Sequence, residues 1–304
     1  MTPELERRIA LIASDRESGA SEILDEALAI LRDALADPAD LISVARALCR
    51  AQPTMAPIWN ASVAALGARD DPERFARFAQ RVARAPEALA RFALECFNDR
   101  ENTGQRVDGG GRVLPLRLVT ISFSRSVARV LEVIAQTRSL RVSCSEGRPA
   151  LEGRRLATRL ATAGIPVTCF TDAAIGQALG GADAVLVGAD AVAPEWFLNK
   201  SGTRMLAAAA AQQGIPLYVL ASRDKFVSHA IAGRLVFREG EPAEVWEGAP
   251  AGVAVRNPYF ESTPLDLVTG IITDAGVLGA ALAPEVCASM EDQASAGLIA
   301  QLHL

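Results

Sequence analysis

Histidine is scarce in this sequence, and its cysteines show no paired spacing. The 304 residues include two histidines, His229 and His303, so we expect neither a histidine-based metal site nor a catalytic triad with histidine as its base. An odd number of scattered cysteines is typical of free thiols in a cytosolic chain. Cys144 and Cys169 fall in or beside apolar runs, where a cysteine commonly acts as a small hydrophobe; a reactive thiol is the alternative. The five cysteines are Cys49, Cys96, Cys144, Cys169 and Cys287.

The sequence also lacks long apolar runs, an excess of basic over acidic residues, and nucleotide-binding fingerprints. No apolar stretch reaches the ~18 residues of a transmembrane helix, and Met1–Arg8 is charged rather than apolar. We therefore expect a cytoplasmic protein without membrane contact. The net charge of -5 disfavours nucleic acid as a partner. Because Gly-x-Gly-x-x-Gly and the P-loop pattern are both absent, we expect no dinucleotide cofactor, and no other cofactor is indicated.

The first third of the chain has helical periodicity. Apolar residues recur at three- and four-residue steps, as in Ile23, Ala27 and Ile30, which is typical of amphipathic helices. The segment NTGQRVDGGGR at 102–112 is rich in glycine, which is typical of a connection. We predict a helical domain over 1–104 and a linker over 105–112. Besides the run that starts near Ile23, helices are predicted over 39–50, 56–66, 72–85 and 86–97.

From 113 to 304 short apolar runs alternate with helical segments. Such alternation favours parallel βαβ units, and strands that are apolar on both faces fit a sheet covered by helices on both sides. The predicted fold class is α/β, with the N-terminal helical domain followed by a Rossmann-like, mostly parallel sheet flanked by helices. Strands are predicted at 116–121, 140–145, 167–171, 184–187, 217–220 and 235–237. Helices are predicted at 126–136, 152–163, 173–179, 202–213 and 224–230, with a helix-like run at 265–272.

Polar clusters follow four of the predicted strands. In a doubly wound sheet, ligands bind outside the carboxyl ends of the strands. After the first strand, Ser124 and Arg125 open a helix, where free N–H groups and the helix dipole suit an anion; ordinary capping is the alternative. Arg148 follows the second strand and suits a phosphate, with a capping turn as the alternative. The further candidates for contacts with a phosphate or with sugar hydroxyls are Glu146, Glu152, Gly153, Asp172, Asn199 and Lys200.

Asp190 follows the strand predicted at 184–187. A lone aspartate at a strand end acts as an acid or base, binds a hydroxyl group or only caps a turn. Asn199 and Lys200 lead into an alanine-rich helix, and an amide, an ammonium and a hydroxyl at a helix start form a reasonable phosphate cradle. A phosphorylated small molecule held between the helical domain and the sheet is therefore the expected partner.

In this order, the clusters resemble the initiation factor 2B alpha/beta/delta family, which also contains methylthioribose-1-phosphate isomerase and ribose-1,5-bisphosphate isomerase. The resemblance covers essentially the whole second domain and implies a dimer or larger homo-oligomer. The isomerases use a cysteine and an aspartate, which align here with Ser122 and Asp190. The segments that carry the resemblance are TISFSRSVARVL at 120–131, SEGRPALEGRRLA at 145–157, AGIPVTCFTDAAIG at 163–176, VLVGADAV at 185–192, NKSGT at 199–203 and NPYFESTP at 257–264.

The sequence departs from the isomerases at three places. Ser122 replaces the thiol, and a serine hydroxyl stays neutral at pH 7. Two arginines of the isomerases align with Ser18 and Gln52, which removes two charge-assisted phosphate contacts. The FSR pattern at 123–125 resembles the regulatory, non-isomerase members, especially the beta-type subunits of the exchange factor in translation initiation.

Three functions follow from these observations. The first is a regulatory, non-catalytic protein that binds a phosphorylated sugar or nucleotide. The second is an aldose-phosphate isomerase-like enzyme with altered chemistry, in which Asp190 is the acid or base and Ser122 lies nearby. The third is an oligomeric scaffold with a vestigial site. The first predicts that a ligand stabilises the protein without turnover. The second predicts turnover that requires Asp190, and the third predicts no response to any ligand.

Overall fold

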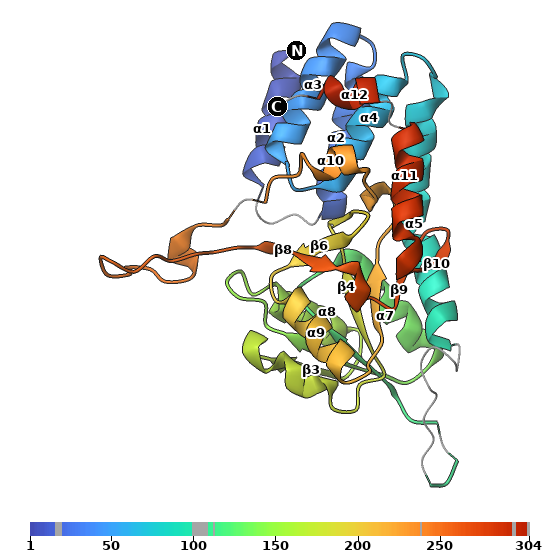
Figure 1. The fold of residues 1–304 in the computed structure, drawn as a ribbon, viewed down its shortest axis with the longest axis vertical. Helices are drawn as coiled ribbons and strands as arrows, with labels where there is room; N and C mark the ends of the chain where they lie inside the picture. The colour runs from blue at the N-terminus through green and yellow to red at the C-terminus, as the bar shows by residue number, and fades with distance from the viewer. Residues whose placement is uncertain (16–19, 99–108, 112, 238, 294–295, 303–304) are drawn as a thin grey trace.

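The computed structural model describes residues 1–15, 20–98, 109–111, 113–237, 239–293 and 296–302. The linker predicted at 105–112 lies almost wholly outside them. Figure 1 shows the helical N-terminal part above a sheet flanked by helices, with an arm extending to one side. The α/β class, the N-terminal helices and the mostly parallel sheet are confirmed.

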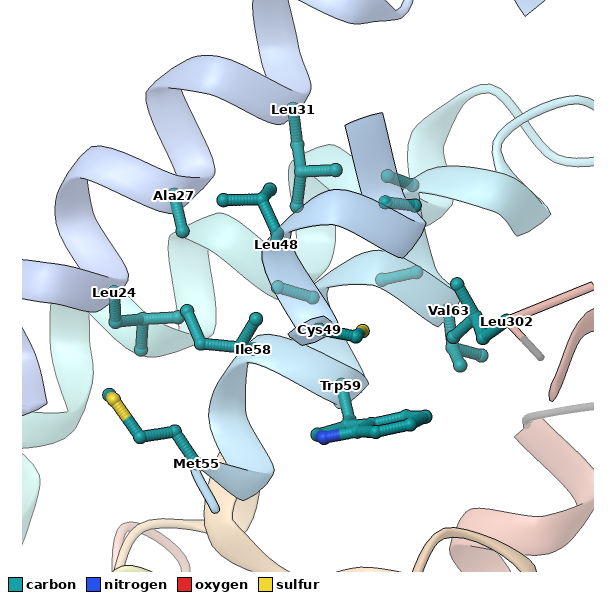
Figure 2. Close-up of a cluster of buried hydrophobic side chains, with 14 of the residues drawn as sticks. Leu24, Ala27, Leu31, Leu48, Cys49, Met55, Ile58, Trp59, Val63 and Leu302 are labelled. Atoms are coloured by element: carbon teal, nitrogen blue, oxygen red, sulfur yellow. The ribbon is translucent and has the colours of Figure 1, made fainter. Parts of the chain in front are cut away.

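In the part of the chain that the structure describes, five helices precede the sheet: α1 (Pro3–Ser14), α2 (Ala20–Ala34), α3 (Pro38–Ala51), α4 (Ala56–Gly67) and α5 (Glu73–Asn98). Helix α4 is buried along its whole length because the other helices and the end of the chain surround it. Its Trp59 packs with side chains such as Leu24 and Leu302 in one hydrophobic cluster (Figure 2). The last short helix, α12 (Ala296–Ala300), returns to this cluster and adds Leu298 and Ile299.

Helix α5 corrects the prediction of two helices over 72–85 and 86–97. It continues through Pro86, although an internal proline removes a backbone hydrogen bond and costs ~3 kcal/mol. The apolar face is continuous across the proline, and this packing outweighs the local cost. Phe75 and Phe78 join the helical cluster, whereas Leu89 and Phe97 join the cluster beneath the sheet. One helix therefore contributes to two of the three hydrophobic clusters of the described residues.

The main sheet has the order β10-β9-β7-β4-β1-β2-β3 in the described part of the chain. All neighbouring strands in it are parallel except β9 and β10. The order reverses between β1 and β4, which is the switch point where ligands of doubly wound folds bind. The strands are β1 (Leu116–Thr120), β2 (Leu140–Ser145), β3 (Val167–Phe170), β4 (Ala184–Gly188), β7 (Leu217–Leu220), β9 (Gly270–Thr273) and β10 (Gly276–Gly279).

The crossovers contain helices close to the predicted ranges. Ser124 caps α7 by accepting from the Val127 N–H at 3.4 Å, which confirms the capping interpretation of that serine. The segment predicted as a helix over 173–179 is a 3-10 helix, η1 (Asp172–Leu179), and the one over 224–230 is split into η2 (Arg223–Lys225) and α10 (His229–Ala232). The remaining helices are α7 (Arg125–Thr137), α8 (Glu152–Thr162), α9 (Thr203–Gln212) and α11 (Ala283–Gln293).

A second, antiparallel sheet of β5 (Ala191–Val192), β6 (Trp196–Lys200) and β8 (Phe260–Pro264) was not predicted. The predicted strand at 235–237 is wrong: Val236 and Phe237 are exposed and lead into the arm. The helix-like run at 265–272 is also wrong, because it forms a 3-10 turn, η4 (Leu265–Leu267), and β9. Among the described residues, no helix has the length and apolar character needed to span a membrane.

The arm, residues 239–258, is the orange extension in Figure 1. At its base Asn257 donates hydrogen bonds to the Glu241 carbonyl and the Glu244 carboxylate, at 2.8 and 2.9 Å. The Tyr259 hydroxyl contacts the same carboxylate. Trp246 is 51% exposed. The arm is therefore fixed at its base beside the polar end of the sheet.

Candidate functional site

The switch point brings the segments after β1 and β4 together. Val119 pairs with Val185, so continuing the register places Ser122 beside Gly188. Ser122 has φ +64°, a left-handed conformation that costs a non-glycine residue ~1–2 kcal/mol. A Cβ on Gly188 would lie 3.1 Å from the Ser124 Oγ. The strained Ser122 therefore lies at the junction where the sheet reverses its order, as residues at functional sites often do.

Asp190 lies just beyond β4, at the start of the second sheet. Its N–H donates to the Leu198 carbonyl at 2.8 Å, and Ala191 pairs with Leu198, so Asp190 stands across from Asn199. Desolvation raises the pKa of the Asp190 carboxyl, and the positive charge of Lys225 partly opposes this rise. A carboxyl group with a raised pKa can hold a proton and deliver it in a reaction.

Lys225 is a residue that the sequence analysis missed. It ends η2 after β7, and its Nζ donates to the Ala189 carbonyl at 2.6 Å. The next residue, Phe226, forms a bridge with Val192, so this segment runs alongside the one that contains Asp190. The polar run Ser222–Lys225, directly after a strand, is the signal that could have found it.

Lys200 is buried at the end of β6 and connects the second sheet to α8. Its Nζ lies 2.7 Å from the Glu152 Oε1 and 4.3 Å from the centre of the Tyr259 ring. Asn199 donates to the Thr203 Oγ1 at 3.0 Å. Lys200 and Glu152, 48 residues apart in the chain, are thereby brought together.

The turn between β2 and α8 depends on glycine and on Asp172. A Cβ on Gly153 would lie 1.7 Å from the Ser145 carbonyl oxygen, so only glycine lets α8 approach the end of β2 so closely. Asp172 accepts from the Gly147 and Arg148 N–H groups, at 2.9 and 2.7 Å. Asp172, which the sequence offers either as a cap of the site or as a partner for a hydroxyl group, therefore uses both carboxylate oxygens to hold the turn.

Three buried oxygen atoms at this edge lack a hydrogen-bond partner: Thr120 Oγ1, Ser145 Oγ and Glu152 Oε2. They come from the ends of β1 and β2 and from the first residue of α8. Buried polar atoms are normally hydrogen-bonded, and each exception calls for an explanation such as an unseen ligand or water. The two hydroxyl groups can donate to a ligand oxygen, whereas the ionised carboxylate can only accept.

A family model described as "Initiation factor 2 subunit family" matches residues 12–280. The chain belongs to this family. The resemblance inferred from the sequence motifs is thereby confirmed.

Two curated relatives of this Initiation factor 2 subunit family member are named isomerases. The "5-deoxyribose 1-phosphate isomerase" of Moorella thermoacetica is 39% identical over 171 residues, which is 53% of this chain and 49% of that protein. The "Methylthioribose-1-phosphate isomerase" of Rhodopirellula baltica is 39% identical over 174 residues, with the same coverage. The chain spans about half the length of these curated relatives that it matches.

Solved structures agree on the fold. The translation initiation factor eIF-2B of Pyrococcus horikoshii OT3 matches with a TM-score of 0.73 and 24% identity, covering 91% of this chain and 98% of that one. The 5-methylthioribose 1-phosphate isomerase of the same organism gives 0.63 and 23%, covering 95% and 87%. A chain of the tetrameric eIF2B-beta2-delta2 complex of C. thermophilum gives 0.70 and 20%, covering 94% and 93%. At these identities the likeness establishes the fold alone.

Within this family fold, three predicted charged residues have protein partners. Arg125 forms an ion pair with Glu22 of α2. Arg148 reaches the arm, where it donates to the Glu244 and Val245 carbonyls at 3.4 Å. Glu146 accepts from Arg154, with a shortest distance of 2.5 Å. The two arginines thus contact different parts of the chain: Arg125 contacts α2, and Arg148 contacts the arm.

The start of α9 differs from the phosphate cradle expected there. Glu261 of β8 accepts from the N–H groups of Gly202 and Arg204 with one oxygen, at 2.7 and 2.9 Å. The Thr203 hydroxyl donates to the Lys200 carbonyl at 2.6 Å. A carboxylate already occupies the positive end of this helix, so a phosphate cannot use these two groups as well.

Cys144 fits the structural interpretation of a small buried side chain. Its side chain packs in the cluster beneath the sheet, and burial raises the pKa of its thiol to about 12. The described residues include no group of three or more His, Cys, Asp and Glu side chains arranged to hold a metal ion.

Proposed function

We propose that this protein isomerises a phosphorylated aldose to the corresponding ketose phosphate, with Asp190 as the acid–base group. The observation that carries the proposal is the position of Asp190 at the switch point: Lys225 bonds the Ala189 carbonyl next to it, and the strained Ser122 is level with Gly188, two residues before it. The isomerase names of the curated relatives support this function better than the regulatory one that the FSR pattern favours.

The phosphate would bind at the turn between β2 and α8. The Ser145 Oγ has unused hydrogen-bonding capacity there, and Arg148 is exposed at the border of the turn. Helix N-termini attract anions through free N–H groups and the helix dipole, and Leu151, which precedes α8, provides no side-chain cap. Lys200 neutralises the Glu152 carboxylate at this turn, which would otherwise repel a phosphate.

The Ser122 hydroxyl does not ionise at neutral pH, so it is not the base of the reaction. The proposed reaction therefore uses Asp190 as its acid–base group. Protonated Asp190 would give its proton to the ring oxygen of a sugar 1-phosphate while the bond from that oxygen to C1 breaks. The hydrogen on C2 then moves to C1 with its bonding electrons. The C2 hydroxyl returns a proton to Asp190 and becomes the ketone. The sum is an isomerisation that leaves Asp190 as it began.

Ser122 would act by position rather than as a nucleophile. It is half-buried, and the backbone register places it beside Gly188, two residues before Asp190. Its hydroxyl can donate to a substrate oxygen and accept from a substrate hydroxyl. This role needs no thiol, which fits the altered chemistry expected from the sequence.

Incubation of the whole protein with ribose 1-phosphate, 5-deoxyribose 1-phosphate and methylthioribose 1-phosphate tests the proposal. Proton NMR would show the two C1 protons of a ketose 1-phosphate. A thermal-shift titration with the same compounds measures binding separately. Stabilisation without ketose at any enzyme concentration contradicts isomerisation and favours the regulatory function. No stabilisation by any compound favours the scaffold.

We also propose that the chain forms a homo-oligomer. The tetrameric complex that contains a similar fold supports this, as does the exposed Trp246 on the arm. Light scattering coupled to size exclusion measures the mass directly. A monomer at micromolar concentration contradicts the proposal.

A further inference from the structure

Cys144 and Cys169 are direct neighbours across two strands. In the parallel pair of β2 and β3, Cys144 is in register with Cys169. Neighbouring strands lie ~4.8 Å apart, and a disulfide forms between residues with Cα atoms ~4.4–6.8 Å apart. In-register residues share a face of the sheet, so both thiols lie on the side covered by α8.

The two thiols differ in access to solvent. Cys169 is exposed, whereas Cys144 is buried. The elevated pKa of Cys144 has desolvation as its largest cause, and the neighbouring Cys169 raises it further. Cys169 is thus the thiol that a reagent in solution meets first, and the buried Cys144 is its in-register neighbour on β2.

The strand that carries Cys169 can adjust to a bond. β3 is the last strand on its side of the sheet and pairs only with β2 among the described strands. A small shift of an edge strand disturbs one ladder of hydrogen bonds, whereas a shift of β2 would disturb two. The approach of the two sulfur atoms therefore requires movement only where the sheet is least constrained.

We propose that Cys144 and Cys169 form a reversible disulfide when the protein meets a low-molecular-weight disulfide such as oxidised glutathione. The Cys169 thiolate attacks the reagent, forms a mixed disulfide and releases one reduced thiol. Cys144 then loses its proton and attacks the Cys169 sulfur, which releases the second reduced thiol. Two electrons pass from the cysteine pair to the reagent, and a dithiol reductant reverses both steps.

The bond would act on the turn between β2 and α8. The Cys144 Sγ donates a weak hydrogen bond to the Gly153 carbonyl at 3.8 Å, and Gly153 is in the first turn of α8. A disulfide removes this S–H donor and draws the sulfur toward β3. The Gly153 carbonyl loses this S–H donor at the residue where α8 lies against the Ser145 backbone. This modification site exists whether or not the protein is an isomerase.

Oxidised glutathione applied to the folded, full-length protein tests the proposal, followed by thiol titration in denaturant and mass spectrometry of a non-reducing tryptic digest. We expect the titratable thiols to fall from five to three. A cross-linked pair of peptides should appear, one starting at Val142 and the other at Leu160. Dithiothreitol should restore five thiols.

Variants identify the pair. Cys169→Ser replaces an exposed side chain and should keep all four remaining thiols reduced. Phenylarsine oxide, which bridges two nearby thiols without an oxidant, should bind one arsenic per chain in the wild type and none in Cys169→Ser. A stable mixed disulfide with glutathione on Cys169, with Cys144 still free, would overturn the proposal. So would equal arsenic binding by the two proteins.

Discussion

The Lys225 ammonium donates a 2.6 Å hydrogen bond to the backbone carbonyl of Ala189, the residue that precedes Asp190. This bond places a positive charge beside a carboxyl group that burial would otherwise keep protonated more strongly. The two residues come from segments that follow neighbouring strands, β4 and β7. The charge of Lys225 therefore limits how far burial raises the pKa of Asp190.

Replacement of Lys225 by methionine should raise the pKa of Asp190 further, because the opposing positive charge is removed. The carboxyl resonance of Asp190 in a carbon-13 NMR titration measures this shift without substrate. Lys225→Arg keeps the charge and is the matched control. An unchanged Asp190 titration in Lys225→Met would show that the two groups are not coupled.

Asp190→Asn should stabilise the protein at neutral pH. The raised pKa means that the folded state binds the Asp190 proton more tightly than the unfolded state, whose pKa is near 3.8. The wild type therefore loses stability as pH rises above that value through the folded pKa, and the asparagine variant does not. Urea unfolding at several pH values measures the difference in free energy of unfolding between the variant and the wild type. This difference should widen as the pH rises and vanish in acid. A difference independent of pH would contradict the burial of a charge at this position.

Gly153→Ala should destabilise the protein by about 3 kcal/mol or more, since the added Cβ would collide with the Ser145 backbone and overpacking of this kind is costly. Gly176→Ala is the matched control, because nothing lies within 4 Å of a Cβ added there. Denaturant unfolding measures both variants. Equal stabilities would show that α8 does not need its close approach to β2.

Lys200→Met should cost about 3 kcal/mol, the lower end for breaking a buried ion pair, because it leaves the Glu152 carboxylate without its cation. The Glu152 side chain is 21% exposed, which places the effect at the lower end. Glu152→Gln combined with Lys200→Met should recover part of the loss. If the double variant loses the sum of the single effects, the pair contributes no coupling.

Replacement of solvent water by D2O tests the route of the hydrogen atom. If the C2 hydrogen moves to C1 with its electrons, the ketose formed in D2O carries no deuterium at C1. Proton NMR of the product measures this directly. Substantial deuterium at C1 would instead indicate a proton removed to a base and returned from solvent, and would require a second basic group near Ser122.

Among the described strands, the sequence predicted the parallel strands β1, β2, β3, β4 and β7, because most of them are continuous apolar runs, but it missed β9, which is also parallel and buried. Ala184–Gly188 and Leu217–Leu220 are buried along their whole length. The second sheet escaped prediction because its strands mix polar and apolar side chains: β6 ends in Asn199 and Lys200, and β8 contains Glu261. The pairing of Lys200 in β6 with Phe260 in β8 joins distant parts of the chain, for which local patterns carry no signal.

The candidate site could be predicted as a set of residues but not as a set of contacts. Strand ends pointed to Asp190 and Lys200 because polar residues follow apolar runs there. Glu152, which binds Lys200, is 48 residues away from it in the chain. Glu261, which caps α9, is 57 residues away from Arg204, whose N–H it accepts from. Long-range partners of this kind follow from the fold, and sequence spacing does not reveal them.

Turnover and binding by Asp190→Asn, measured side by side with the wild type, test the central claim most directly. The substrate is the sugar 1-phosphate that the wild type converts. We expect the variant to keep ligand-induced thermal stabilisation while its turnover falls by roughly 10²–10⁴-fold, the usual contribution of a general acid–base group. Turnover within a few-fold of wild type, with binding unchanged, would contradict the assignment of Asp190 as the group that moves the proton.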